Sequence, residues 1–303
     1  MKRDRASATA EVIAASTLLL DTEPSTASLI APGAAPLCEV LLSDGARGRF
    51  LRWSARNKWM RPLWRHLERV TLPGITRHYW LRKQWIEARV RTQIAGGVRR
   101  VVVLGAGLDT LALRLAPLWP DVDWIEVDHP ATQAMKQRAL DRAGIKVPPT
   151  LRFVAADLAI NDAWPDSVGA GPQATVVVIE GLLMYLAREK VEEVLARQLP
   201  ALAGGSLSIV FSYMVQWPQG RGGFRPSSRL INAWLAVQRE PFLWMHEPES
   251  LPQWLASLGY SVVAHAEPPF GAWDTESPHQ VGLLRGENLV EAQLAAPTSP
   301  KAA

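Results

Sequence analysis

The sequence is short of the residues that build disulfides, metal clusters and membrane spans. It has one cysteine, Cys38, so it can form neither an internal disulfide nor a thiolate metal cluster. No apolar run reaches the roughly 18 residues that a membrane-spanning helix needs. The 6 histidines are scattered and offer no cluster of metal ligands. We therefore predict a protein without a metal site, whose activity survives excess chelator.

The N-terminus lacks the uninterrupted apolar stretch of a signal peptide. MKRDR followed by ASATAEVIAASTLLL has the right general order, but Glu11 breaks the apolar part. We interpret residues 7–21 as an amphipathic helix with Ser7 as its N-cap. A cytoplasmic location is the corresponding expectation.

The excess of positive over negative charge is small for the whole chain. The 303 residues can bury the core of one α/β domain, with or without a cap, and the net charge is +4. This is not the clustered excess that is typical of a nucleic-acid-binding protein. Nucleic acid is therefore not the expected partner.

Residues 47–69 are the exception to that balance. They hold eight Lys or Arg against one Glu, with Trp53, Trp59 and Trp64 between them. Three interpretations stay open. The favoured one is a solvated basic helix whose tryptophans pack on the main domain. The others are a surface for an anionic membrane or an acidic partner, and a nucleic-acid contact.

The stretch VVVLGAGLDT (101–110) is the main motif. Four apolar residues predict a strand buried on both faces. Gly105 and Gly107 permit a sharp turn and let a ligand approach the backbone without meeting a Cβ. Helical spacing follows, so the order is strand, glycine turn, helix. That order predicts a nucleotide-type site at the carboxyl end of the strand.

The motif lacks the third glycine of a dinucleotide fingerprint. Thr110 stands at that position, and Asp109 lies on the turn. A carboxylate there would repel a pyrophosphate. It would not repel S-adenosylmethionine, which has no phosphate and carries a sulfonium and an ammonium group.

Strands and helices alternate along the chain, which predicts a mostly parallel sheet covered on both faces, with one terminal strand antiparallel. We expect a helical N-terminal extension (1–77), a ligand-binding domain (78–285) with an inserted cap near 215–249, and a flexible tail (286–303). The expected strands begin or lie within 101–104, 124–128, 151–158, 174–186, 206–214, 260–266 and 279–285.

Several acidic residues follow the expected strands, where a ligand would lie. Asp128 comes 23 residues after Gly105, near the offset at which an acid reaches a ribose diol. Glu180 ends an otherwise apolar strand and needs either solvent or a cationic partner. Tyr185 is placed to line the same crevice.

These motifs together resemble the leucine carboxyl methyltransferase family of S-adenosylmethionine-dependent methyltransferases, which includes bacterial small-molecule O-methyltransferases. The likeness covers about residues 78–285 and is carried by the helix around Arg82, VVVLGAGLDT, WIEVDHPATQAMK, AADL and EGLLMYL. It implies an α/β, class I methyltransferase (Rossmann-like) fold with seven strands in the order 3-2-1-4-5-7-6. The residues around SLIAPGAAP lack the Asp-Pro pair frequent in the family, so acceptor contacts do not carry over.

The resemblance also implies the cofactor contacts. Arg82 would hold the carboxylate of S-adenosylmethionine, Gly105 its methionine part and Asp128 its ribose. Asp157 and Leu158 would contact the adenine, and Glu180 the amino group. The full set expected around the cofactor is Arg82, Gly105, Gly107, Asp109, Asp128, Asp157, Leu158 and Glu180.

We therefore expect an enzyme that methylates a carboxylate or hydroxyl oxygen of a small molecule. A hydroxyl acceptor would need a base, for which the candidates are Tyr185, Tyr213 and His246. The alternatives are a non-catalytic binding protein that uses residues 47–69, and a nicotinamide dehydrogenase.

The acceptor is expected to be apolar or aromatic with an anionic end. Aromatic residues that would wall it and arginines that would form a cationic rim gather late in the chain: Trp217, Phe224, Trp234, Phe242, Trp244, Trp273, Arg221, Arg225, Arg229 and Arg239.

Overall fold

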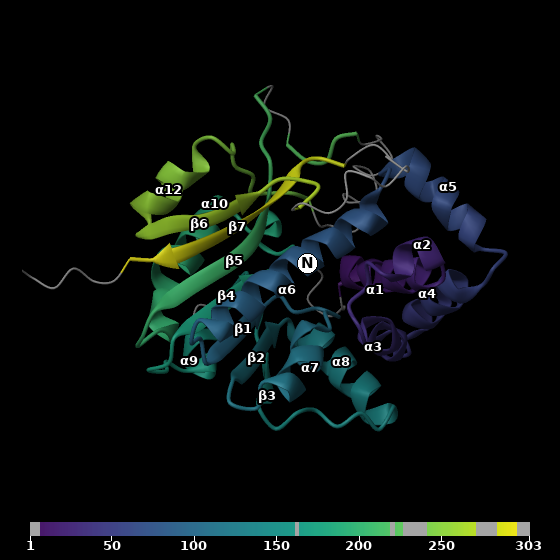
Figure 1. Ribbon diagram of the computed structural model, residues 1–303, viewed down its shortest axis with the longest axis horizontal. Helices are drawn as coiled ribbons and strands as arrows, with labels where there is room; N and C mark the ends of the chain where they lie inside the picture. The colour runs from purple at the N-terminus through teal and green to yellow at the C-terminus, as the bar shows by residue number, and fades with distance from the viewer. Residues whose placement is uncertain (1–6, 161–163, 219–221, 227–240, 271–283, 296–303) are drawn as a thin grey trace, which may run out of the picture.

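The computed structural model describes residues 7–160, 164–218, 222–226, 241–270 and 284–295, and its centre is a seven-stranded sheet (Figure 1). The strand order is β3-β2-β1-β4-β5-β7-β6. The strands are β1 (Arg100–Leu104), β2 (Asp123–Asp128), β3 (Leu151–Ala155), β4 (Thr175–Ile179), β5 (Leu207–Met214), β6 (Tyr260–Ala266) and β7 (Glu287–Leu294). The predicted class I methyltransferase fold is confirmed.

The first five strands are parallel, and β1 and β4 at the centre are apolar and fully buried because both faces of the sheet are covered there. β1 pairs with β2 on one side and with β4 on the other, and all five of its residues are buried. Val101 and Val103 contribute to the core on one face, and Val102 and Leu104 to the core on the other. The carboxyl ends of β1, β2 and β4 therefore share one edge, where the glycine turn lies.

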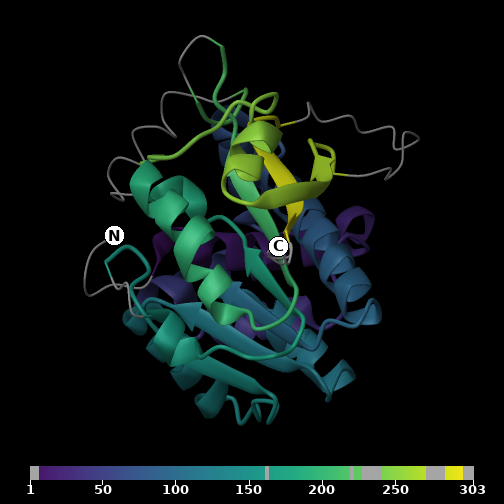
Figure 2. The same cartoon turned by 90° about the vertical axis from the view of Figure 1, so that its left-hand side faces the viewer.

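Helices pack on both faces of this sheet, and Figure 2 shows the blue α6 and the green-teal α10 on opposite sides of it. The helices are α1 (Ala8–Asp21), α2 (Pro24–Ala27), α3 (Ala34–Leu41), α4 (Ala46–Arg56), α5 (Arg61–Thr71), α6 (Ile75–Ala95), α7 (Leu111–Leu115), α8 (Pro130–Arg142), α9 (Trp164–Val168), α10 (Arg188–Glu193) and α12 (Leu251–Ser257). A π-helical segment (Val194–Gln198) continues α10, and short 3-10 helices span Ala116–Leu118, Leu183–Tyr185 and Pro200–Leu202. In the described part of the chain, no helix is both long and apolar enough to cross a bilayer.

The C-terminal strand corrects the predicted boundary at residue 285. The segment expected to be a flexible tail forms β7, which lies antiparallel between β5 and β6. Of the strand expected over 279–285, only residues 284–285 are described, and they lie outside β7. The sequence did not predict β7 because its acidic residues suggested an exposed segment. In the structure, Glu287 and Glu291 are buried and pair with Arg82 and Arg89 of α6.

The N-terminal extension is helical, as predicted, and part of it covers the ligand edge. Ser7 caps α1 by accepting a hydrogen bond from the backbone N–H of Ala10 at 3.2 Å. α1 and α6 are joined by the Trp80 indole, which donates to the Thr17 hydroxyl at 3.0 Å.

The basic segment 47–69 forms two helices, α4 and α5, and its predicted packing is wrong for two of its three tryptophans. Trp64 is partly buried against the core and donates to Ser54. Trp53 and Trp59 are 53% and 79% exposed. Because α4 ends at Arg56 and α5 begins at Arg61, the residues between them turn Trp59 away from the body.

The expected cap is described only in part. The helix expected around 226–240 lies outside the described residues, as do Trp234, Trp273, Arg221, Arg229 and Arg239. The described portion returns to the ligand edge, where the backbone N–H of Leu243 donates to the carbonyl of Met184 at 2.7 Å.

The central position of β7 can be tested by two substitutions in the same strand. Val290 is 0% exposed, whereas Gln293 is exposed. We expect Val290→Asp to lower the free energy of unfolding by more than about 3 kcal/mol, because it buries a charge without a partner. Gln293→Asp should change it by less than about 1 kcal/mol. Equal, small effects in urea unfolding would show that residues 286–295 are a tail after all.

Candidate functional site

A cavity of about 430 Å³ opens at the carboxyl edge of β1, β2 and β4. Its lining combines the glycine turn, the ends of these strands, and one side of α1. Every cofactor residue predicted from the sequence lines it: Arg82, Gly105, Gly107, Asp109, Asp128, Asp157, Leu158 and Glu180. The fold therefore brings together residues that are up to 98 positions apart in the chain.

The glycine turn is built for close approach. Gly105 and Gly107 have φ values of +66° and +51°, which side-chain-bearing residues rarely adopt. A Cβ on Gly105 would lie 3.2 Å from the Leu182 side chain, and one on Gly107 would lie 3.2 Å from Ala10. Any larger residue would therefore both strain the turn and reduce the cavity.

Asp128 ends β2 directly beside this turn. Its Oδ2 accepts a hydrogen bond from the backbone N–H of Gly107 at 2.6 Å. Burial raises the pKa of Asp128, although the backbone N–H groups of Gly107 and His129 act in the opposite direction. A buried carboxylate with remaining acceptor capacity suits a ligand that donates hydrogen bonds, such as a diol.

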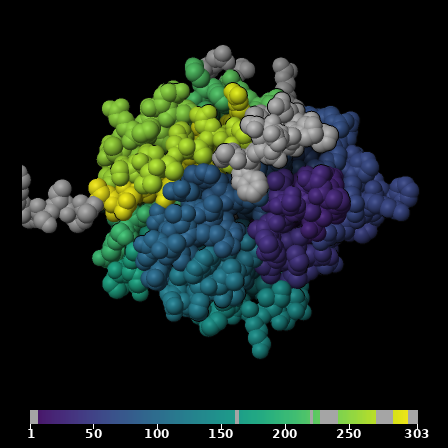
Figure 3. Space-filling model, in the orientation of Figure 1, coloured from purple at the N-terminus to yellow at the C-terminus, as the bar shows by residue number. Residues whose placement is uncertain are grey.

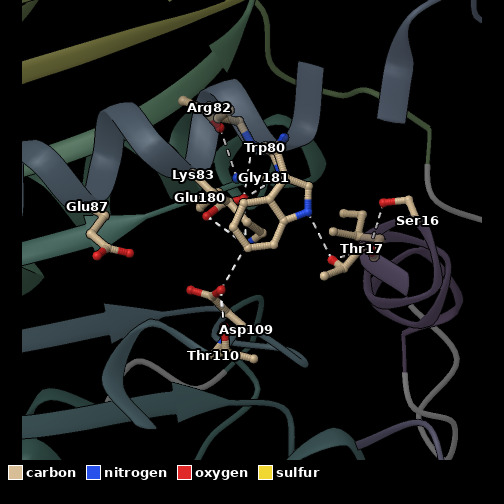
Figure 4. Close-up of polar contacts among 12 residues, drawn as sticks. Ser16, Thr17, Trp80, Arg82, Lys83, Glu87, Asp109, Thr110, Glu180 and Gly181 are labelled. Atoms are coloured by element: carbon tan, nitrogen blue, oxygen red, sulfur yellow. Dashed lines mark hydrogen bonds and ion pairs between the residues drawn. The ribbon is translucent and has the colours of Figure 1, made fainter. Parts of the chain in front are cut away.

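A network of charges forms the wall of the cavity beside α6 (Figure 4). Arg82 donates to Glu180 through Nε at 2.9 Å and Nη2 at 2.6 Å, and through Nη1 to both oxygens of Glu287 at 2.7 and 2.9 Å. Lys83 contacts Asp109 at 2.8 Å and Glu180 at 3.0 Å. The network thus joins α6, the glycine turn, the end of β4 and β7.

The pKa values of this network are set by burial working against close opposite charges. Burial alone would raise the pKa of Glu287, but Arg82 and a hydrogen bond with His78 lower it to about 2. For Asp109, burial is likewise outweighed by Lys83, and the pKa falls to about 2. Burial alone would lower the pKa of Lys83, but Asp109 and Glu180 raise it. These groups are therefore all charged near neutral pH.

Asp157 and Leu158 follow β3 and line the far side of the cavity. The Asp157 carboxylate lies 3.8 Å from Nε2 of His129, and Leu158 is 6% exposed. Tyr185, in the turn after β4, also lines the cavity and packs against Phe242 with ring centroids 5.7 Å apart.

Two of the three candidate bases do not reach the cavity, which corrects that part of the prediction. Tyr213 is 0% exposed in the core, where its hydroxyl contacts Nε2 of His265 at 3.0 Å. His246 packs against Trp254 and makes a 3.0 Å contact with the Glu247 carbonyl. Tyr213 lies within β5, and the backbone N–H of His246 donates to the carbonyl of Met214 at the end of that strand at 3.0 Å. Neither lines the cavity, so Tyr185 is the candidate that remains.

The expected aromatic wall and cationic rim are also largely absent from the described lining. Trp244 is a core residue, 3% exposed, and the Trp217 indole donates to the Gly223 carbonyl. Arg225 stacks over the Trp217 ring at 4.5 Å and does not line the cavity. Phe224 packs against His78 and Phe242. The described wall on this side is instead aliphatic, with Leu243 and Pro241.

Sequence reasoning missed two lysines that hold the acids of the site. Lys83 lies beside Arg82 in the middle of α6, and its contacts with Asp109 and Glu180 are visible only in three dimensions. Buried Lys136 donates to the Asp109 carbonyl and to Glu126, each at 2.6 Å. A lysine inside the predicted helix and an acid inside a predicted apolar strand were the available signals.

The charge balance of the lining fits a cation. Four carboxylates, Asp109, Asp128, Asp157 and Glu180, line the cavity against two cationic side chains, Arg82 and Lys83. Both cations are already paired within the network. Opposite charge favours binding, so a sulfonium and an ammonium group fit this cavity better than a pyrophosphate does. Among the described residues, no group of three His, Cys, Asp or Glu could hold a metal ion.

Comparison with known proteins agrees with this geometry. The leucine carboxyl methyltransferase profile matches residues 28–198, which is more than half of the chain. The chain belongs to the leucine carboxyl methyltransferase family. This family membership confirms the resemblance inferred from the motifs.

Curated relatives from bacteria have names that agree with this family. YktD of Bacillus subtilis is 27% identical over 189 residues, and a Streptomyces avermitilis protein is 31% identical over 195 residues. Both are provisionally named as S-adenosyl-L-methionine-dependent methyltransferases. The matches cover 62% and 61% of this chain and 62% of each relative, so the chain spans less than two thirds of their length.

A solved structure is also similar in shape. Magnesium protoporphyrin IX methyltransferase from Synechocystis, with bound SAH, is 14% identical and has a TM-score of 0.46. The likeness covers 79% of this chain and 95% of that one.

The Lys136–Glu126 pair beneath the turn generates a pH prediction. Burial raises the pKa of Glu126 and Lys136 opposes that shift, so Lys136→Met should raise the pKa further. A raised carboxyl pKa contributes stability below the unfolded value, and this contribution is lost as pH rises. At pH 8 the variant should therefore lose about 3–5 kcal/mol of unfolding free energy, and less at pH 5, where Glu126 keeps its proton.

The matched control is the double variant Lys136→Met/Glu126→Gln, which has no titratable group at this pair. Its stability to urea should therefore change less between pH 5 and pH 8 than that of Lys136→Met. A Lys136→Met variant as stable at pH 8 as at pH 5 would contradict the assignment of a charged, paired Glu126.

Proposed function

We propose that this protein binds S-adenosylmethionine and transfers its methyl group to an oxygen atom of a small molecule. The observation that carries the proposal is the acid-rich cavity around Gly105, Gly107 and Asp128 in a chain of this family. The names of the relatives support the cofactor and the class of reaction. An oxygen acceptor is the finer part of the proposal, and the cytoplasmic location stays a prediction.

Each side of the cavity has a distinct task in this proposal. Asp128 would accept the hydrogen bonds of the ribose diol, and Gly107 would leave room for the ligand beside it. Asp157 and Leu158 would bind the adenine ring. The acidic side chains of Asp109 and Glu180 would attract the positively charged end of the ligand.

The hydrogen-bond donors of Arg82 are already used within the protein. Its Nε and Nη2 both donate to Glu180, so few of its donors point into the cavity. We propose that Glu180 turns towards the ligand's ammonium group, which frees these donors for the ligand's carboxylate. Glu287 remains on Nη1 and keeps the guanidinium in place.

When bound, S-adenosylmethionine would supply a sulfonium-bound methyl group that a nucleophile can attack, with the neutral thioether as the leaving group. The protein's contribution is to hold the acceptor oxygen in line and to exclude water. α1 closes the cavity with Ala10, Ile13 and Thr17, and Trp80 and Cys38 add buried surface. This apolar wall suits an apolar acceptor. A carboxylate acceptor needs no base, whereas a hydroxyl acceptor would use Tyr185.

A nicotinamide dehydrogenase is disfavoured by the turn itself. Asp109 has a pKa of about 2, so a negative charge stands where a pyrophosphate would lie. A non-catalytic binding protein would share the cavity but transfer no methyl group, so a transfer assay separates it from the enzyme.

The first test of the proposal is cofactor affinity. Asp128→Ala should weaken binding of S-adenosylmethionine by about 1.5–3 kcal/mol, because hydrogen bonds to a charged group are lost. Asp121→Ala is the matched control, since Asp121 is an exposed acid outside the cavity. Calorimetry should find its affinity unchanged, and equal affinities in the two variants would remove Asp128 from the site.

The second test is the pH dependence of the chemical step, measured in single turnovers with radiolabelled cofactor and apolar aryl or acyl carboxylates. A carboxylate is ionised throughout the neutral range, so the rate should change little between about pH 6 and 9. Tyr185→Phe should then leave it within about twofold. A rate that rises tenfold per pH unit, with phenols as the better acceptors, would contradict the carboxylate form of the proposal.

A further inference from the structure

An exposed apolar surface lies on α4, α5 and the turn between them, away from the cavity. We call it the α4–α5 face and define it by Phe50, Trp53, Trp59, Leu63, Leu67 and Val70. These side chains are between 43% and 79% exposed. They are six of the ten exposed large hydrophobic residues in the described part of the chain, although they come from only 21 consecutive positions.

On helix α5, the exposed apolar side chains lie on one face of the helix. Leu63, Leu67 and Val70 follow the i, i+4, i+7 spacing of one helix face. The neighbouring side contacts the body, because Arg65 pairs with Glu23 at 2.8 Å and Glu68 accepts from the Thr76 hydroxyl at 2.8 Å. α5 is therefore held in place by polar contacts while its apolar face has no partner among the described residues.

The basic residues of this segment form two groups, one that pairs with acids of the body and one that does not. Arg47, Arg56 and Arg65 form ion pairs with acids of the N-terminal helices. Arg49, Arg52, Lys58 and Arg69 form no ion pair with any carboxylate that the structure describes. Lys58 lies over the Trp59 ring, with Nζ 5.2 Å from its centroid. Unpaired cations thus surround the exposed apolar side chains.

We propose that the α4–α5 face docks on the surface of an anionic lipid membrane. A helix with tryptophan and leucine on one face and basic residues at its borders lies in the headgroup layer and is attracted by negative lipids. Tryptophan prefers that layer, because its ring is apolar and its N–H is polar. In Figures 1 and 3, α5 lies at the right-hand edge of the molecule, where a flat surface can reach it.

Two other occupants fit the same surface less well. A second copy would bring like charges together, since a twofold contact places this basic surface, with Arg49, Arg52 and Arg69, against the same basic surface of the partner. A nucleic acid would stack on Trp53 and Trp59, but Leu63, Leu67 and Val70 offer nothing to bases or phosphates. The membrane is the occupant that uses both the aliphatic stripe and the cations.

A single helix, α1, separates the α4–α5 face from the cavity. α4 packs on α1, and α1 supplies Ala10, Ile13 and Thr17 to the cavity wall. An apolar molecule dissolved in the membrane would therefore be close to the site. The docking proposal itself does not depend on methyl transfer, and its test needs no acceptor.

The test is sedimentation of the full chain with phosphatidylcholine vesicles, with and without phosphatidylglycerol. We expect the anionic vesicles to bind at least about tenfold more protein, and high salt to remove most of that difference. Trp59→Ser/Leu67→Gln and, separately, Arg49→Gln/Arg52→Gln/Arg69→Gln should each weaken binding to anionic vesicles about tenfold. The matched control is Leu118→Gln/Val263→Gln, which removes two exposed hydrophobic residues elsewhere and should bind as the natural sequence does.

Several outcomes would overturn the proposal. One is natural protein that binds neutral and anionic vesicles equally, or not at all, and this comparison holds even if a variant misfolds. Another is α4–α5 variants, checked by thermal unfolding, that bind as tightly as the control. A dimer that these variants dissociate, or oligonucleotide binding that they abolish, without any binding to vesicles, would assign the face to a second copy or to nucleic acid.

Discussion

The site depends on one buried guanidinium, that of Arg82. Burying a charge costs several kcal/mol unless close opposite charges and hydrogen bonds replace its hydration. Here Glu180 and Glu287 do so, and they come from the end of β4 and from β7. The same contacts therefore hold α6 against the sheet and fix the acids that face the cavity. Among the described residues, removal of Arg82 would leave Glu287 without an arginine or lysine partner, whereas Glu180 would keep Lys83.

This network also explains why acids can gather around one cavity. Four carboxylates close together would repel one another in a low-dielectric site. Lys83 bridges Asp109 and Glu180, and Lys136 reaches the Asp109 carbonyl from below. The protein thus holds its acidic side chains in place through contacts with lysines, and a cationic ligand would add to an arrangement whose charge is already balanced in part.

The sequence was sufficient for the features with a strong local pattern. β1 and β4 are apolar because they are buried on both faces, and the order of the strands along the chain implied the sheet. The glycine turn and Asp128 follow from short-range spacing. Tyr213 was misplaced because the sequence does not show which face of β5 a residue joins. His246 was misplaced because its segment is positioned by long-range contacts, such as the hydrogen bond from its backbone N–H to the Met214 carbonyl. β7 was missed because Glu287 and Glu291 look exposed until Arg82 and Arg89, some two hundred positions earlier, come beside them.

The position of β7 has a consequence for the order in which the sheet can form. β7 lies between β5 and β6 in the described sheet, although it follows both of them along the chain. β1 to β5 can pair as they are synthesised, but β6 cannot take its place in this order until residues 287–294 are available. Arg82 and Arg89 of α6 likewise meet Glu287 and Glu291 only then. The addition of β7 therefore completes the sheet, and a cut between β6 and β7 would remove a central strand together with the counter-charges of α6.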